Sequence, residues 1–275
     1  MSEIEKSIQK TYHKRLWTPF IQAIKKYELI KEGDHVAVCI SGGKDSWLMA
    51  MLFKLLHRIT EVPFLVSYIS MDPGYNEKNR AKIEDNAKLF DIPLKIFETE
   101  IFDVANSTDR SPCYLCARMR RGALYAKSKE MGCNKIALGH HFDDVIVTTL
   151  MAMFYGSQLQ AMIPKLHSTN FEGMELIRPL YCIHEEDIIA WRDYNKLDFL
   201  QCACRFTENI GDSGDGIGES KRQEIKALIK ELRKNNPGIE MSIFNSIHNV
   251  NLDMFPEYKF NGKRHSFTDF YDEKN

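Results

Sequence analysis

Residues 41–46 read Ser-Gly-Gly-Lys-Asp-Ser, and they lie between two apolar stretches, residues 35–40 and 47–56. The first stretch has the length of a buried parallel strand, and the second has the length of a helix. Glycines in such a turn let the backbone approach an anion, and the N–H groups that open the helix point at it. An ordinary strand-to-helix turn has no need of Lys-Asp-Ser. The turn therefore predicts a phosphate site in an α/β fold.

The side chains of this turn suit a nucleotide that carries a metal ion. The hydroxyls of Ser41 and Ser46 add hydrogen-bond donors. Asp45 repels phosphate, so we expect it to hold a Mg²⁺ ion that bridges the phosphates. The turn is not a Walker loop, because G-x-x-x-x-G-K-[ST] is absent. The nucleotide-binding residues predicted here are Ser41, Gly42, Gly43, Lys44, Asp45 and Ser46.

Strand-like and helix-like stretches alternate along the chain. Strands are expected at residues 35–40, 63–71, 94–98, 135–138 and 175–180, and helices at 47–56, 76–90, 116–131, 143–155, 184–196 and 219–235. This alternation predicts βαβ units and a doubly wound, mostly parallel α/β sheet. We expect an N-terminal helical segment at 1–33, the α/β domain at 34–200, a cysteine loop and helix at 201–255, and a tail without regular structure at 256–275.

The composition is that of an ordinary globular protein. Hydrophobic residues make up 44% and charged residues 27% of the chain, and 37 basic against 38 acidic residues give a net charge of -1. Bulk charge therefore gives no support for RNA binding, which would need a local basic face. Candidates for such a face are Lys6, Lys10, Lys14, Arg15, Lys25, Lys26, Arg118, Arg120 and Arg121.

No apolar stretch reaches the roughly 18 residues of a membrane helix and the N-terminus is not a signal peptide, so we expect a cytoplasmic protein without membrane contact.

Residues 139–144, Gly-His-His-Phe-Asp-Asp, place further polar groups where a strand ends and a helix begins. Two histidines and two aspartates there can bind Mg²⁺ and nucleotide, or act as acid and base. The alternative is that one aspartate caps the helix and His140 is a packed ring. The phosphate turn favours the first interpretation, with Gly139, His140, Asp143 and Asp144 as nucleotide-binding residues.

Three of the seven cysteines suggest a metal centre. Cysteines of a cytoplasmic protein stay reduced, so closely spaced cysteines favour metal binding or catalysis over a disulfide. Cys113 and Cys116 can both reach one metal, and a third thiolate comes from Cys204 or Cys202. Structural zinc takes four ligands, whereas a cluster with one open iron needs only three. Zinc on four cysteines and a redox or persulfide pair remain alternatives. Cys39, Cys133 and Cys182 lie in or beside apolar segments and are expected to be core residues.

The turn at 41–46 resembles the PP-loop, SGGxDS, of ATP-pyrophosphatases. Together with Cys-x-x-Cys, Gly-His-His-x-Asp-Asp, a later cysteine and the strings at 152–156, 164–166 and 177–180, it resembles the tRNA 2-thiocytidine synthetases and their 2-thiouridine relatives. The similarity runs from about residue 14 to about residue 255. The resemblance implies that Ser70, Met71 and Asp72, at the end of the second strand, hold adenine or ribose.

The resemblance also implies the cofactors, the partners and the reaction. The family carries a [4Fe-4S] cluster on three cysteines, matched here by Cys113, Cys116 and, in preference to Cys202, Cys204. It implies ATP, Mg²⁺, a tRNA substrate, sulfide or a cysteine desulfurase as sulfur donor, and a homodimer. ATP would adenylate C2 of an anticodon-loop cytidine at position 32, and sulfur would replace the oxygen. The catalytic residues would be Asp45, Asp144, Cys113 and Cys116.

Three other functions remain open from the sequence. The first is the same chemistry on a tRNA uridine or on a small molecule. The second is an ammonia-using amide ligase, which shares the PP-loop but has no use for the cysteines. The third is a metal-bound RNA-binding module without enzymatic activity.

Overall fold

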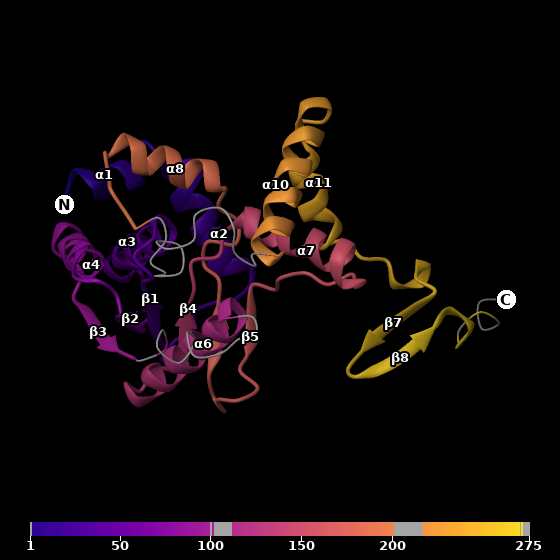
Figure 1. The fold of residues 1–275 in the computed structure, drawn as a ribbon, viewed down its shortest axis with the longest axis horizontal. Coiled ribbons are helices and arrows are strands. Elements are labelled where there is room, and N and C mark those ends of the chain that lie inside the picture. The colour runs from indigo at the N-terminus through magenta and orange to yellow at the C-terminus, as the bar shows by residue number, and fades with distance from the viewer. Residues whose placement is uncertain (1, 100, 102–111, 201–216, 270, 272–275) are drawn as a thin grey trace. The chain divides into compact units, whose positions relative to one another are not determined.

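The computed structural model describes residues 2–99, 101, 112–200, 217–269 and 271, with the backbone alone at 112–117 and 217–220 (Figure 1). Within this part of the chain, six strands form one sheet in the order β3-β2-β1-β4-β6-β5. They are β1 (His35–Cys39), β2 (Leu65–Asp72), β3 (Leu94–Glu98), β4 (Lys135–Ala137), β5 (Lys165–His167) and β6 (Glu175–Ile177). All neighbours are parallel except β5 and β6, which are antiparallel. The predicted doubly wound, mostly parallel fold is confirmed.

Strand β1 divides the core between the two faces of the sheet. Val36 and Val38 belong to one apolar cluster, which includes Trp47 of helix α3 (Lys44–Ile59). Ala37 belongs to a second cluster, which includes Tyr125 of helix α6 (Pro112–Glu130). Successive residues of a strand point to opposite faces, so a continuous apolar run is what a sheet covered by helices on both sides requires.

The N-terminal segment packs into the same core as α3. It comprises α1 (Glu3–Gln9), a π-helix (His13–Trp17) and α2 (Thr18–Lys26), rather than a helical stretch that continues to residue 33. Ile8, Leu16 and Phe20 are fully buried in the cluster that contains Trp47. A π turn bonds residue i to i+5 and adds one residue, which accounts for the irregular spacing of these apolar positions.

The other helices largely follow the sequence pattern. They are α4 (Glu77–Phe90), α7 (Phe142–Gly156), α8 (Glu185–Tyr194), α10 (Ile217–Asn235) and α11 (Ile239–Ser246). Helix α6 begins at Pro112, earlier than the predicted start at 116, because proline lacks an N–H and suits the first turn. Strand β6 ends at Ile177 instead of residue 180. None of the helices described is both long and apolar enough to cross a membrane.

The chain divides into two compact units, residues 1–222 and 223–275. The second contains a hairpin of β7 (Glu257–Phe260) and β8 (Lys263–Ser266), so the prediction of no regular structure at 256–275 is wrong for these residues. Asn261 and Gly262 join the strands with φ of 49° and 77°. A two-residue hairpin turn with both φ values positive favours Asn-Gly, and this dipeptide was the signal in the sequence.

Candidate active site

The predicted phosphate turn forms the connection between β1 and α3. Gly42 has φ of +90°, and its carbonyl accepts a hydrogen bond from the Leu200 N–H at 3.1 Å. Gly43 is the N-cap of α3, and no side chain caps the N–H groups of the first helical turn. Uncapped N–H groups at a helix start, beside a glycine turn, form an anion-binding site.

Gly42→Ala is expected to destabilise the protein by about 2–4 kcal/mol, from left-handed backbone strain and overpacking. An added Cβ would lie 2.7 Å from Leu200 Cδ1 and 3.2 Å from Ile83 Cγ1. Urea unfolding measures the loss. The matched control is Gly122→Ala, where no atom lies within 4 Å of the added Cβ and helix propensity favours alanine. Equal urea midpoints of unfolding for the two variants would contradict close packing around Gly42.

The two serines of the turn have different roles. The Ser46 hydroxyl donates to the Gly43 carbonyl at 2.8 Å, and this hydrogen bond within the turn stabilises its conformation. The Ser41 hydroxyl lies 3.3 Å from that of Ser46, and Ser41 is exposed. Ser41 is therefore the better placed of the two to donate to a bound anion.

The strand end at β4 touches the phosphate turn directly. A Cβ on Gly139 would lie 3.2 Å from both the Asp45 carbonyl carbon and the Ser46 nitrogen. This backbone contact brings the segment 139–144 against residues 41–46, as the pairing of β1 with β4 requires. The two motifs predicted from sequence thus form one site.

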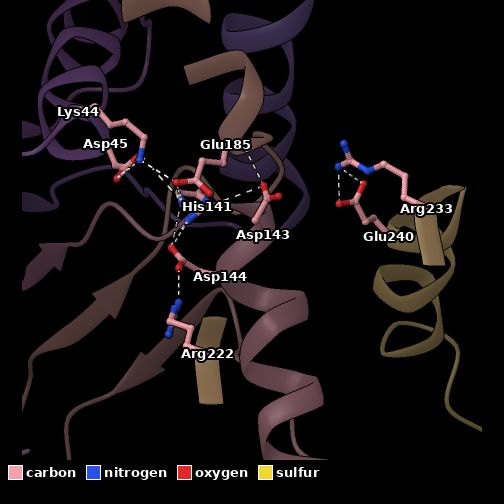
Figure 2. Close-up of polar contacts among 9 residues, drawn as sticks. All are labelled: Lys44, Asp45, His141, Asp143, Asp144, Glu185, Arg222, Arg233 and Glu240. Carbon is pink, nitrogen blue, oxygen red and sulfur yellow. Dashed lines mark hydrogen bonds and ion pairs between the residues drawn. The ribbon is translucent and has the colours of Figure 1, made fainter. Parts of the chain in front are cut away.

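Charged side chains from three helices converge there (Figure 2). Lys44 Nζ lies 3.2 Å from the Asp45 carboxylate and 2.9 Å from Glu185 Oε1. The buried His141 ring carries Nε2 at 3.5 Å from Asp144 Oδ2, 3.9 Å from Glu185 Oε1 and 4.0 Å from Asp45 Oδ1. Nδ1 lies 3.7 Å from Asp143 Oδ2, so the ring lies among four carboxylates. His141 was predicted only as part of the Gly-His-His motif, not as a nucleotide-binding residue, and Glu185 was not predicted. Glu185 reaches the site through folding, from the first residue of α8.

The two catalytic candidates among these carboxylates have opposite pKa shifts. Burial raises the pKa of Asp45, although the charges of His141 and Lys44 counteract it. Burial acts in the same sense on Asp144, but His141 and Arg222 outweigh it and lower its pKa. Asp45 Oδ1 is buried and has no hydrogen bond among the described residues, although Lys44 Nζ lies 3.2 Å away. Asp144 instead accepts from the His141 N–H at 3.2 Å and pairs with Arg222. Asp45 is thus paired with Lys44, yet burial still leaves its pKa raised where that of Asp144 is lowered.

Asp143 has a structural role. Its Oδ2 accepts the Glu185 N–H at 2.7 Å, so it caps the first turn of α8 and fixes Glu185 beside Lys44. In the part of the chain described, no three His, Cys, Asp or Glu side chains are grouped closely enough to hold a metal by themselves. A magnesium ion here would need oxygen ligands from a bound nucleotide, as is usual for this ion.

His140 is buried beside this cluster, and its Nδ1 has no hydrogen-bond partner among the described residues. Burial, helped by the Arg178 charge, lowers the pKa of His140 to about 4 from the usual 6.5. Between these two pH values the unfolded chain binds a proton that the folded protein does not. Stability therefore falls as the pH falls from 6.5 towards 4.

The loss of stability attributable to His140 should reach up to about 3 kcal/mol, at about 1.4 kcal/mol for each pH unit. His140→Gln is expected to remove this part of the pH dependence. Urea unfolding of both proteins at pH 7.5, 6.5, 5.5 and 4.5 measures it, with the exposed His167→Gln as control. An unchanged slope in His140→Gln would show that the buried ring is protonated in the folded state.

The end of β2 holds the three residues predicted to bind adenine or ribose. Ser70 is fully buried, with no hydrogen-bond partner for its hydroxyl in the part of the chain that is described, and Met71 is 4% exposed. Asp72 accepts the N–H groups of Gly74 and Tyr75 at 2.9 and 2.7 Å and lies 2.7 Å from Arg80. Asp72 therefore shapes the turn after β2.

Cys113 and Cys116 lie in the first turns of α6. Met119 of the same helix, one turn further on, packs in a cluster with Met71. The Cys-x-x-Cys backbone is thereby held near the carboxyl end of β2, on the edge of the sheet that carries the phosphate turn. Cys202 and Cys204 lie outside the described residues. Cys39 and Cys133 are buried, as predicted, and Cys182 is partly buried against the core.

Comparisons with known proteins agree with this architecture. Residues 5–205 match the family model ATP_bind_3, described as a PP-loop domain. The chain is 35% identical over 247 residues to the tRNA-cytidine(32) 2-sulfurtransferase of Geotalea daltonii, covering 88% of this chain and 94% of that protein. It is 36% identical over 244 residues to the protein of the same name from Vibrio campbellii, covering 86% and 77%.

A solved structure of similar fold is the U34-tRNA thiolase NcsA from Methanococcus maripaludis with its [4Fe-4S] cluster. It aligns with a TM-score of 0.66 and 23% identity, covering 88% of this chain and 80% of that one. At this identity the likeness establishes the fold.

Proposed function

Since the chain belongs to the PP-loop family and, within it, to the tRNA-cytidine(32) 2-sulfurtransferases, we propose that it converts a tRNA cytidine at position 32 into 2-thiocytidine at the expense of ATP. The observation that carries this proposal is the contact of Gly139 with the backbone of Asp45 and Ser46. It joins a phosphate turn and a cluster of ionisable side chains into one site, within residues 34–200.

ATP binds with its pyrophosphate portion on residues 41–46. The positive φ of Gly42 and the uncapped first turn of α3 support this placement. Lys44 adds a cation, because Asp45 and Glu185 raise its pKa against the opposing effect of burial. Ser70 and Met71, at the end of β2, face the adenosine portion.

A magnesium ion fits beside Asp45. Among the described residues its buried Oδ1 has Lys44 Nζ at 3.2 Å and no hydrogen bond, and burial raises the pKa of Asp45, which a bound cation would lower. Phosphate oxygens would complete the shell, with Asp144 as a further oxygen ligand.

The reaction begins when the C2 oxygen of the cytidine attacks the α-phosphate. A bond forms between this oxygen and phosphorus, and pyrophosphate leaves with the electrons of the bond between the α-phosphate and the bridging oxygen. The C2 oxygen then belongs to a phosphate ester, which leaves far more easily than the original oxygen. Lys44 and the N–H groups of the α3 first turn stabilise the charge that develops on the phosphates. His141 and Asp144 orient the groups around the attacked phosphorus.

Cys113 and Cys116 fit an iron–sulfur cluster at the same edge of the sheet. The i, i+3 spacing of Cys113 and Cys116 on α6 and the packing of Met119 near Met71 support this, and Cys204 is the third ligand by family resemblance. When bound, a [4Fe-4S] cluster supplies the sulfur nucleophile that no side chain provides. Sulfur ends on C2, and AMP leaves with the former C2 oxygen. Sulfide or a cysteine desulfurase as donor, and a homodimeric assembly, are expected from the same resemblance.

The test uses anaerobically purified protein with ATP, Mg²⁺, sulfide and bulk tRNA, followed by nucleoside mass spectrometry. We expect 2-thiocytidine, with one AMP formed for each modified base. Thiolated uridine without thiolated cytidine would assign a different acceptor. ATP cleavage that depends on ammonia and leaves tRNA unmodified would indicate an amide ligase.

A further inference from the structure

Arg178 follows β6 directly and is 8% exposed. Its Nη1 donates to the Ile163 carbonyl at 2.5 Å, and its buried Nε has no hydrogen-bond partner in the described ranges. No carboxylate in the described part of the chain lies within ion-pair distance of this guanidinium. By contrast, the buried Lys135 has Asp34 at 3.0 Å and Glu175 at 2.8 Å. Among the described residues Arg178 is thus a buried cation without an ion pair, and only the more distant charge of Asp144 acts against its burial.

Such an arrangement is unfavourable by itself. A buried charge loses its hydration, and only a partner of opposite charge compensates for the loss. Burial, and then the charge of the exposed Arg121, lowers the pKa of Arg178 to about 10, so the group is still charged at neutral pH. Arg121 lies on α6, and its charge adds to the positive potential instead of cancelling it.

The position of Arg178 relates it to the proposed active site. Ala137 of β4 pairs with Ile177 of β6, and the Leu138 N–H donates to the Ile177 carbonyl at 3.0 Å. Arg178 therefore emerges beside Gly139 and His140, on the strand next to the one that touches the phosphate turn. The unpartnered Nδ1 of His140 is a second polar atom without a ligand in this neighbourhood.

We propose that Arg178 binds a phosphate group of a substrate, and that this phosphate is the counter-ion it lacks. The inference rests on the proposed function, because that function supplies the two substrates whose phosphates Arg178 could bind. One is the α-phosphate of ATP, which becomes AMP, and the other is a backbone phosphate of the tRNA beside the target cytidine. A guanidinium matches the paired oxygens of either. If it contacts the α-phosphate, Arg178 is a catalytic residue. If it binds the tRNA backbone, Arg178 positions the target base.

The first measurement is the stability of Arg178→Met without ligand. Removal of an unpaired buried charge in favour of an apolar side chain of similar length should leave the melting temperature within about 2 °C of the wild type. Addition of AMP or inorganic phosphate should raise the melting temperature of the wild type more than that of Arg178→Met, in which residues 41–46 still bind phosphate. Arg192→Met, which removes an arginine paired with the neighbouring Asp193, is the matched control and should respond as the wild type does.

The second measurement separates the two phosphate sources. If Arg178 binds the α-phosphate of ATP, AMP formation in the presence of tRNA should fall about 100-fold in Arg178→Met, with tRNA affinity unchanged. If Arg178 binds a tRNA phosphate, the Kd for tRNA should rise about 10-fold in Arg178→Met. The salt dependence of tRNA binding should weaken by about one phosphate contact. Arg178→Lys should recover part of either loss, because it restores the charge without the paired donors.

Activity, tRNA affinity and ligand-induced stabilisation within twofold of the wild type would overturn the inference. So would a loss of activity in Arg178→Met that merely follows a lower melting temperature and is fully restored by Arg178→Lys. If the wild type modifies no tRNA, the proposed function fails, and the stabilisation by AMP or phosphate still decides the role of Arg178.

Discussion

Asp45→Ala is expected to reduce ATP-dependent pyrophosphate release at least about 1000-fold, while the iron content and absorption of the protein stay unchanged. Asp45 is the carboxylate at the phosphate turn, and its buried Oδ1 has no hydrogen bond among the described residues, so its removal deprives the proposed magnesium ion of one of its two proposed protein ligands. Metal ions and fixed donors supply several kcal/mol of transition-state stabilisation in phosphoryl transfer, which corresponds to losses of this size. Pyrophosphate release with saturating ATP and tRNA measures the effect.

Asp91→Ala is the matched control for this variant. Asp91 is a highly exposed aspartate on the same α/β unit, paired with Lys54 at 2.9 Å. It should release pyrophosphate at the wild-type rate. Release by Asp45→Ala within tenfold of the wild type would mean that the metal is held elsewhere.

Cys113→Ala is expected to abolish 2-thiocytidine formation and to lose the cluster absorption, while ATP binding remains measurable. The reason is spatial, since the cysteine lies on α6 and the phosphate turn lies between β1 and α3. A cluster with two remaining protein thiolates is not held, whereas the nucleotide contacts are untouched. Nucleoside mass spectrometry and equilibrium ATP binding measure the two activities separately.

Cys133→Ala is the control, because Cys133 is a buried cysteine of the core. It should retain iron and thiolation, with a modest loss of stability from the smaller side chain. Full thiolation by Cys113→Ala would exclude the cluster as the source of sulfur in this protein.

The local features of the fold could be predicted from sequence. The strand and helix around residues 41–46 are specified by apolar stretches of different length, and the Gly-Gly pair between them predicts the turn, although Leu200 then packs against it. The same holds for Gly139, because parallel pairing of β1 and β4 brings two strand ends to one edge of the sheet.

Contacts between distant segments could not be predicted. Glu185 approaches Lys44 across 141 residues, and Arg222 approaches Asp144 across 78. Nothing in the sequence around Glu185 distinguishes it from an ordinary acidic residue at a helix start. Arg178 was noted only within a family-like string, and its burial without a counter-ion follows from the end of β6 at Ile177.

Two short elements were missed for other reasons. Strand β5 has three residues, too few for a period of two to be recognised, and it pairs antiparallel at the edge of the sheet. The hairpin at 257–266 has mostly polar, exposed strands, so only its Asn-Gly turn could have revealed it.

The account depends on direct attack of the cytidine C2 oxygen on the α-phosphate of ATP bound at the glycine turn. A tRNA with ¹⁸O at C2 of cytidine 32, thiolated in ordinary water, tests this step, because the fate of that oxygen is read from the mass of the AMP. We predict one ¹⁸O atom in each AMP released. Unlabelled AMP, with the ¹⁸O recovered in water, would contradict adenylation of the base.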